Sequence, residues 1–362
     1  MSDTTTRQDL IGMLPEEAEA ALRAHFASRG QPAYRAGQVV RWIFEREAFG
    51  FDAMTDLPAA ERLALGGAFT LCAPAAAKVS VSTDGTAKHL WRLDDGELIE
   101  SVLIPTSTRL TLCISSQAGC AMACEFCATG WSGYRRQLTA GEIVAQYRGA
   151  RRWARDNGYA DISNIVFMGM GEPLMNPKAL FPTLAILNRG YGVGARRITV
   201  STVGVVPGIV RLAEMPEQFR LAVSLHAPNH ELRQKLIPLE KKYPLPELLD
   251  ALRRFDEAGG KRITFEYVMI DGVTDEPHLA DELAGVIGEF NAFVNLIPFN
   301  PIPGTDWQPS TRARLNYFVE RLEKRGISAF VRESRGSDIA AACGQLRAEV
   351  TQGRKPVQMG SL

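Results

Sequence analysis

The feature that most constrains the fold is an alternation of strand-like and helix-like patterns that begins at residue 109. Seven short runs have the pattern of strands, at 109–115, 162–168, 197–201, 220–225, 262–269, 293–299 and 329–333. Between them, apolar residues recur at helical spacing near 139–156, 177–189, 207–214, 245–258, 275–290 and 311–325. Strands separated by such helices indicate βαβ units in a parallel sheet. Six or seven units favour a partial or full barrel over an open sheet, within an α/β fold.

The first hundred residues follow other patterns. Residues 7 to about 70 have helical spacing of apolar positions, including an alanine-rich run after Pro15 and the segment 35–45. The pattern then alternates with period two over 78–83, 89–93 and 97–105, with Asp-Gly turns between these runs. We therefore expect four segments: a helical N-terminal accessory domain (1–75), a β-meander linker (76–105), a barrel with its C-terminal segment (106–350) and a tail (351–362).

Charge gives no general indication of a partner, because 41 basic residues balance 41 acidic ones. Basic residues do gather locally: Arg148, Arg151, Arg152 and Arg155 on one helical run, and the pairs 196–197, 241–242, 253–254 and 261–262. Such groups either contact phosphate or are solvated helix faces.

The N-terminus has no apolar signal region, and no run approaches the ~18 apolar residues of a membrane span. We expect a cytoplasmic protein with reduced thiols and no membrane partner.

Three of the six cysteines, Cys120, Cys124 and Cys127, lie within eight residues of one another. Spacing this short lets one loop surround a single metal centre, and thiolates suit zinc or iron–sulfur. Structural zinc usually takes two separated pairs of ligands, and the sequence has no second Cys-x-x-Cys. Three thiolates from one loop suit a cubane cluster that leaves one iron free. A zinc knob remains the alternative.

Unusual residues follow the ends of the predicted strands, where a barrel carries its chemistry. The cysteine loop follows the first strand, and later loops contain Gly169–Pro173, Ser201, Ser224-Leu225-His226 and Asn300. Taken alone, each is more typical of an ordinary turn or capping residue than of a binding site. Cys113 lies within a strand pattern, where a cysteine is usually a small core residue, as we expect for Cys72. Cys343 precedes a glycine among polar residues, so it is either an exposed, flexible thiol or a packed one.

The motif Cys120-x-x-x-Cys124-x-Phe126-Cys127 resembles that of the radical S-adenosylmethionine (SAM) superfamily. The resemblance implies that the three cysteines hold a 4Fe-4S cluster and that the amino and carboxylate groups of SAM chelate its open iron. The cluster would donate an electron that cleaves SAM into methionine and a 5′-deoxyadenosyl radical. Gly169–Pro173 is similar to the superfamily's Gly-Gly-Glu segment, so Gly171 and Glu172 would meet the SAM amino group.

Further strings resemble the RlmN-type RNA methyltransferases: 338–346 around Cys343, the spacing from Cys113 to Cys120, 224–228 and 295–301. This resemblance covers nearly the whole chain. It implies a partial (β/α)6-type radical SAM barrel that methylates C2 of an adenosine in 23S ribosomal RNA and in transfer RNA, with two SAM per turnover. It also implies that the N-terminal domain binds RNA, and the electron calls for a reducing partner such as flavodoxin. We expect a monomer, because the sequence has no heptad pattern that argues for an oligomer.

The resemblance also assigns roles to residues. Cys343 would carry a methyl group to the RNA, and Cys113 would release the product through a transient disulfide with Cys343. Glu100 would accept the C2 proton. SAM would be bound by Gly171, Glu172, Ser201, Ser224, Leu225, His226 and Asn300.

Three alternatives have distinct signatures. A Cfr-type enzyme shares the three cluster cysteines and the two further cysteines Cys113 and Cys343 but methylates C8, although 297–303 and Arg335-Gly336 look more like the C2 enzymes. A radical SAM activase or isomerase would need neither Cys113 nor Cys343. A non-enzymatic RNA-binding protein would use the cysteines for structural zinc or iron–sulfur.

Overall fold

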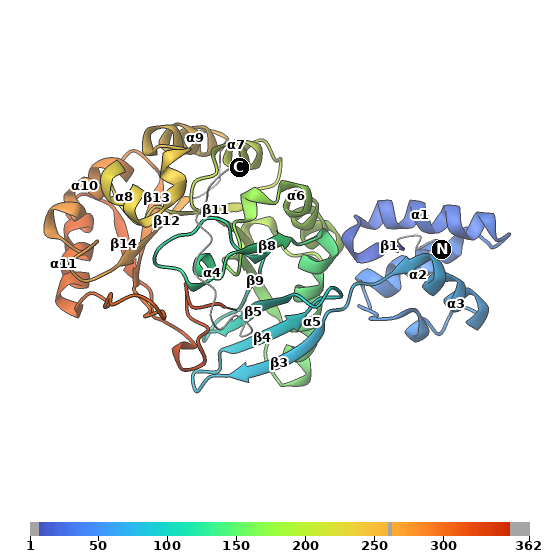
Figure 1. Ribbon diagram of the computed structural model, residues 1–362. Helices are drawn as coiled ribbons and strands as arrows, with labels where there is room; N and C mark the ends of the chain where they lie inside the picture. The colour runs from blue at the N-terminus through green and yellow to red at the C-terminus, as the bar shows by residue number, and fades with distance from the viewer. Residues whose placement is uncertain (1–6, 260–262, 348–362) are drawn as a thin grey trace.

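The computed structural model describes residues 7–259 and 263–347, and the predicted tail and the pair 261–262 lie outside the described residues. Its centre is a ten-stranded sheet in the order β14-β13-β12-β11-β10-β9-β6-β5-β4-β3. The parallel part comprises β6 (Leu110–Cys113), β9 (Ile162–Phe167), β10 (Ile198–Thr202), β11 (Arg220–Ser224), β12 (Ile263–Met269), β13 (Ala292–Pro298) and β14 (Ser328–Val331). These are the seven predicted strands. Because β14 and β3 lie at opposite ends of the sheet, the barrel is partial, which confirms the predicted fold class (Figure 1).

Helices connect successive parallel strands and lie around the sheet (Figure 1). They are α5 (Ala140–Asp156), α6 (Pro177–Ala185) with a π-helical turn (Ile186–Gly190), α7 (Val206–Ala213), α8 (His230–Leu236), α9 (Leu245–Glu257), α10 (Pro277–Ile287) and α11 (Arg312–Glu323). In α9 the buried residues Leu245, Leu248 and Leu252 recur at the spacing of one helix face, as the sequence predicts. Among these connecting helices, α8 alone was not predicted, because its seven residues are too short for a periodic pattern.

The predicted meander continues the barrel sheet instead of separating two domains. Strands β3 (Ala75–Val81), β4 (Ala87–Arg92) and β5 (Leu98–Pro105) are antiparallel, and β5 pairs with β6 so that Val102 lies opposite Cys113. The sequence pattern identified these strands but not their pairing, since alternation says nothing about which strand is the neighbour.

The N-terminal segment forms its own small core beside the barrel (Figure 1). It contains α1 (Pro15–Ser28), α2 (Tyr34–Phe44) and α3 (Ala59–Ala68), and β1 (Gln8–Asp9) pairs with β2 (Phe69–Thr70). Part of α5 completes this core. There Arg148 is fully buried and donates to the Ala48 carbonyl, while Arg151 and Arg155 both pair with Glu47. Three of the four arginines of this run therefore hold the two parts together, which favours the structural alternative for this run over a phosphate contact.

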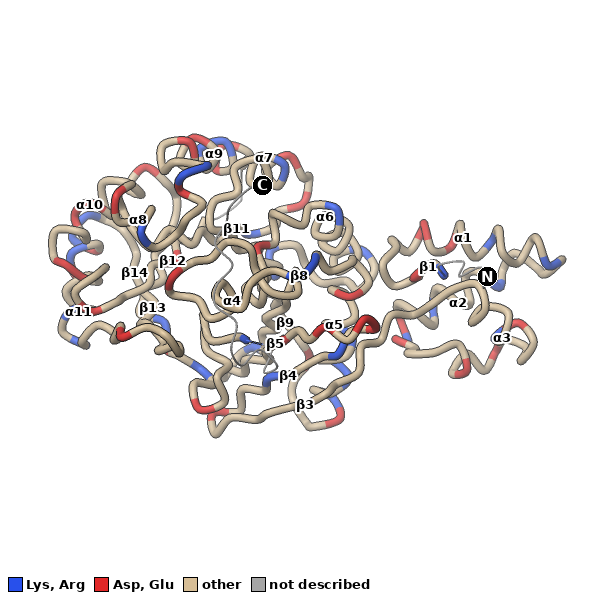
Figure 2. The backbone as a smooth tube through the Cα atoms, in the orientation of Figure 1, with Lys and Arg blue, Asp and Glu red and all other residues tan. Residues whose placement is uncertain are grey.

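Charged residues of both signs are spread over the chain (Figure 2). None of the helices in the described part of the chain is long and apolar enough to cross a membrane.

The loop with the three cysteines is carried by a two-stranded hairpin, β7 (Gln117–Gly119) and β8 (Tyr134–Gln137), and contains the short helix α4 (Ala128–Trp131).

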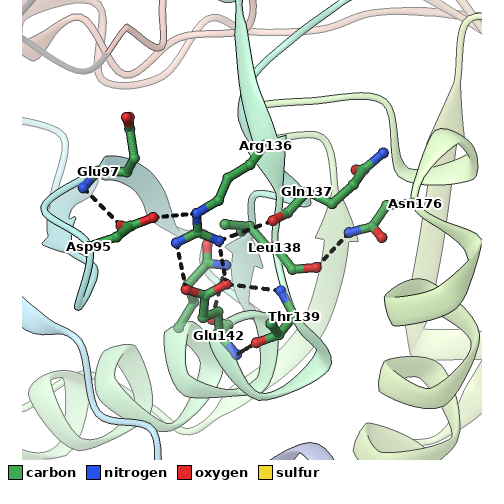
Figure 3. Close-up of polar contacts among 9 residues, drawn as sticks. Asp95, Glu97, Arg136, Gln137, Leu138, Thr139, Glu142 and Asn176 are labelled. Atoms are coloured by element: carbon green, nitrogen blue, oxygen red, sulfur yellow. Dashed lines mark hydrogen bonds and ion pairs between the residues drawn. The ribbon is translucent and has the colours of Figure 1, made fainter. Parts of the chain in front are cut away.

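Arg136 of β8 joins three elements (Figure 3). Its Nε donates to Asp95 in the β4–β5 turn at 2.5 Å, and its two Nη atoms donate to Glu142 of α5 at 2.8 Å. Glu142 also accepts from the Thr139 amide at 2.9 Å, which completes the capping box of α5. Nearby, the Asn176 side chain donates to the Leu138 carbonyl at 2.8 Å.

We predict that Arg136→Met lowers the free energy of unfolding by about 2 kcal/mol, because it removes charge-assisted hydrogen bonds to two carboxylates. Urea denaturation measures the difference. Arg135→Met is the matched control, since Arg135 is its exposed neighbour on the same strand and should change stability little. Equal losses in the two variants would contradict the role given to Arg136.

A second prediction concerns His89 of β4, which is fully buried and stacks on Trp91 with ring centroids 5.1 Å apart. Burial lowers its pKa to about 4. Between the unfolded value near 6.5 and about 4, only the unfolded chain binds this proton, so stability is lost as the pH falls, by about 1.4 kcal/mol per pH unit. His89→Phe should remove this contribution from the slope of unfolding free energy against pH.

Candidate active site at the carboxyl ends of the strands

A cavity of about 940 Å³, including the space open to solvent, lies at the carboxyl ends of the parallel strands. Ten of the predicted site residues line it: Cys120, Cys124, Cys127, Gly171, Glu172, Ser201, Ser224, His226, Asn300 and Cys343. They come from loops far apart in the sequence, which the parallel sheet brings to one edge. Three predicted residues do not line it: Leu225, whose side chain is fully buried, Cys113 and Glu100.

Glu172 is held in a fixed orientation at the cavity wall. Its carboxylate accepts from the amides of Leu174 at 3.0 Å and Val203 at 2.9 Å, and its own amide donates to Gln117 Oε1 at 2.8 Å. Burial raises its pKa to about 7. Gly171 beside it has φ +100°, and a Cβ there would lie 2.5 Å from the Gln117 Cβ. The glycine is therefore required for the carboxylate loop to pack on β7.

His226 links the cysteine loop to the sheet. Its Nδ1 accepts from the Val268 amide at 3.0 Å, and its ring meets the edge of Phe126 at a centroid distance of 4.5 Å. Burial lowers its pKa to about 3, so the ring is neutral at pH 7. Because Phe126 lies between Cys124 and Cys127, this contact orients the loop that carries both thiols.

The three thiols of the loop fit a multi-iron cluster better than a single metal ion. Burial raises the pKa of Cys120 to about 12 and raises the values of Cys124 and Cys127 as well, so a cationic group is needed to keep all three as thiolates. In residues 7–259 and 263–347, no three His, Cys, Asp or Glu side chains are grouped to hold one metal ion. All three thiols instead border the one cavity, which offers space beside them. Three cysteine donors around such a space suit iron–sulfur ligation.

Cys343 lies where the main cavity meets a second, smaller one. It lines both, and Cys113, Cys127 and Arg332 border the smaller cavity with it. The carbonyl of Cys343 accepts from Asn300 Nδ2 at 3.0 Å, and the next carbonyl, of Gly344, accepts from the Ala128 amide at 2.7 Å. Cys343 is thus partly buried and held by its backbone contacts. Of the two alternatives left open by the sequence, this favours the packed thiol over the exposed, flexible one.

Cys113 is buried in β6, and burial raises its pKa to about 12. The expectation of a core residue is correct for its burial, but Cys113 also lines the smaller cavity, as Cys343 does. Both cysteines are free thiols in this structure.

Glu100 is buried in β5 rather than facing solvent, with 1% of its surface exposed. Its carboxylate pairs with Lys88 Nζ at 3.0 Å and accepts from the Arg347 amide at 2.7 Å. It lies on the same face of the sheet as Cys113, because Val102 is two residues along β5 and pairs with Cys113.

Two charged cavity residues were missed from the sequence. Arg332 follows β14, and its interaction with the Cys343 thiol raises its pKa. Glu266 lies within β12, and its Oε1 accepts from Asn295 Nδ2 at 3.0 Å. A glutamate inside an otherwise apolar buried strand is the signal that could have identified Glu266, whereas Arg332 lies among other charged residues and gives no such signal.

Comparisons with known proteins agree with this geometry. Residues 114–283 match the model of the radical SAM superfamily, and residues 13–69 match that of the ribosomal RNA large subunit methyltransferase N-terminal domain. The chain is 51% identical to the probable dual-specificity RNA methyltransferase RlmN of Gemmatimonas aurantiaca, over 98% of this chain and 97% of that protein. It is 45% identical to the dual-specificity RNA methyltransferase RlmN of Alkalilimnicola ehrlichii, over 91% and 92%.

Among solved structures, the crystal structure of a radical SAM methyltransferase from Sphaerobacter thermophilus matches with a TM-score of 0.90 at 47% identity. The match covers 94% of this chain and all of that one. The identities over nearly full length, the two domain models and the shared fold lead to one assignment. The chain belongs to the radical SAM superfamily and, within it, to the RlmN family of enzymes.

Proposed function

We propose that this enzyme methylates C2 of an adenosine in 23S ribosomal RNA and in transfer RNA, through a methyl group carried on Cys343. The observation that carries the proposal is the position of Cys343, between the cavity bordered by the three-cysteine loop and the smaller cavity bordered by Cys113. An activase or isomerase has no use for a thiol pair there. The names of the relatives support RNA as the substrate.

For the cofactors, we assign a 4Fe-4S cluster to Cys120, Cys124 and Cys127, with SAM bound by Gly171, Glu172, Ser201, Ser224, Leu225, His226 and Asn300. When bound, the cluster supplies the electron that cleaves SAM into methionine and a 5′-deoxyadenosyl radical. Glu172 can accept a hydrogen bond from the SAM ammonium, because its carboxylate is already oriented by two backbone amides. Leu225 contributes only backbone, since its side chain is fully buried.

Cys343 first acts as a nucleophile. Its thiolate takes the methyl group of one SAM, so that a sulfur–carbon bond forms as the sulfonium bond breaks and S-adenosylhomocysteine leaves. Arg332 supports this step as a partly buried cation near the thiol. The S-methyl group would then lose a hydrogen atom to the deoxyadenosyl radical. The methylene carbon that stays bonded to the Cys343 sulfur would be the radical, and this carbon would add to C2 of the adenine.

Release uses Cys113. The adduct radical would return one electron to the oxidised cluster, and its C2 proton would pass to a base, the role proposed for Glu100. The Cys113 thiolate attacks the Cys343 sulfur: the disulfide forms, the bond from sulfur to the methylene carbon breaks, and that electron pair takes a proton to complete the methyl group. A cellular reductant must then supply two electrons to restore both thiols.

Delivery of the electron calls for a reducing partner such as flavodoxin, and we propose a monomeric, cytoplasmic enzyme. The RNA must present an unstacked adenosine, because the cavity lies at the barrel rim between loops.

The test uses anaerobically reconstituted enzyme, SAM with a trideuterated methyl group and unmodified ribosomal and transfer RNA. We expect C2-methyladenosine that retains two deuterium atoms, because one is lost when the S-methyl group becomes a methylene radical. Nucleoside mass spectrometry measures both the position and the label. Three retained deuterium atoms would mean direct transfer and would refute the role of Cys343, while a C8 product would overturn the C2 assignment.

Cysteine variants provide the control. Cys343→Ala should abolish turnover, and Cys113→Ala should leave RNA covalently attached to the protein. Cys72→Ala should retain activity, because Cys72 packs beside the N-terminal core and lines neither cavity. Turnover by Cys343→Ala would instead favour a reaction without a carrier thiol.

A further inference from the structure

The C-terminal segment 336–347, here called the strap, carries Cys343 and lies against the antiparallel strands rather than the barrel helices. In Figure 1 the red end of the described chain runs beside β3 and β4. Its start is fixed at the β3–β4 turn, where Asp338 accepts from Ser82 Oγ at 2.6 Å and from the Thr83 amide at 3.3 Å. The Gly336 amide donates to Asp84 at 3.0 Å. These contacts hold the strap before it reaches the thiol.

A buried ion pair holds the strap on both sides of Cys343. Lys88 Nζ donates to the carbonyl of Ala340 at 3.1 Å, and Glu100 accepts from the amide of Arg347 at 2.7 Å. The two side chains pair with each other at 3.0 Å. One partner therefore bonds the strap before the cysteine and the other bonds it after the cysteine.

The sheet register places this pair beside Cys113. Lys88 of β4 lies opposite Val102 of β5, and Val102 lies opposite Cys113 of β6. Side chains of paired residues, and of residues two apart on one strand, share a face of the sheet, so Lys88, Glu100 and Cys113 all face the strap. The sheet that carries Cys113 on β6 thus also carries the two anchors of Cys343, on the neighbouring strands β4 and β5.

The burial of this pair needs a reason. Lys88 is 7% exposed and Glu100 is 1% exposed, and removing two charges from water costs more than a surface ion pair recovers. An apolar pair of similar size would fill the space at less cost but could not bond the strap carbonyl and amide. The polar pair is therefore explained by the backbone groups that it satisfies.

We propose that Lys88 and Glu100 are positioning residues, which hold the strap so that Cys343 faces Cys113 across the smaller cavity. The assignment rests on the proposed function for its importance to turnover, but its geometry concerns only the two thiols. It gives Glu100 a second role besides that of base, and it gives Lys88 a role that proton transfer does not require.

The test follows disulfide formation between the two thiols in cluster-loaded enzyme under anaerobic conditions, without SAM or RNA. Diamide takes the two electrons and two protons that the thiols lose as the bond forms, and peptide mass spectrometry measures the cross-link from Cys113 to Cys343 with time. We expect Lys88→Met to slow the cross-link by about tenfold, because small displacements of reacting groups have effects on this scale. Lys88→Arg, which keeps a buried cation and donor, should react close to the wild-type rate. In turnover assays, Lys88→Met should lower kcat without changing KM for the RNA.

Arg92→Met is the matched control, since Arg92 is an exposed basic residue on the same strand and should not change the rate. Asp338→Ala provides a second variant whose folding is not in question, because Asp338 is exposed. It releases the start of the strap and should slow the cross-link in the same direction. Wild-type rates in both Lys88→Met and Asp338→Ala would overturn the proposal.

Two variants of Glu100 separate the anchor from the base. Both Glu100→Gln and Glu100→Leu remove the base, but only Glu100→Gln keeps an acceptor for the Arg347 amide. The proposal requires slower cross-linking in Glu100→Leu than in Glu100→Gln, whereas a base with no anchoring role leaves both at the wild-type rate. Because no SAM or RNA is present, this result stands whether or not the proposed methyl transfer is correct.

Discussion

Two hydrogen bonds between the cysteine loop and the strap are the contacts on which the site depends. The Ala128 amide donates to the Gly344 carbonyl at 2.7 Å, and Thr129 Oγ1 donates to the Leu346 carbonyl at 2.5 Å. Ala128 directly follows Cys127, and Gly344 directly follows Cys343. The loop that would hold the cluster and the segment that carries the lone thiol are therefore one unit, although more than two hundred residues separate them.

This contact requires unusual backbone. Gly344 has φ +82°, and a Cβ there would lie 3.1 Å from the Phe126 carbonyl oxygen, so only glycine lets the strap approach the loop closely. Ala340 also has a positive φ, of 51°, which an alanine rarely adopts. The bond from Lys88 to the Ala340 carbonyl helps to hold that conformation, which connects the ion pair to the shape of the strap.

The sequence predicted the elements better than it predicted their neighbours. The seven parallel strands follow from periodicity, and the cavity residues follow from the rule that parallel strands end at one edge. The pairing of Val102 with Cys113 could not be predicted, because it depends on which edge of the barrel the meander joins. For the same reason the burial of Glu100 could not be predicted, since a glutamate in a strand commonly faces solvent. The arginines at 148, 151 and 155 were ambiguous because composition cannot distinguish a cation that binds Glu47 from one that binds phosphate.

The two roles of Glu100 are compatible only in succession. As an anchor it is a carboxylate paired with Lys88, and as a base it ends its step as a neutral acid. Accepting the C2 proton would therefore remove the charge that Lys88 neutralises and would leave a buried ammonium without its partner, which is costly. If Glu100 is the proposed base, the strap would be held most firmly before proton transfer and less firmly afterwards, when Cys113 would attack the Cys343 sulfur. Burial of the pair makes this coupling strong, since in water the same change of charge would be screened.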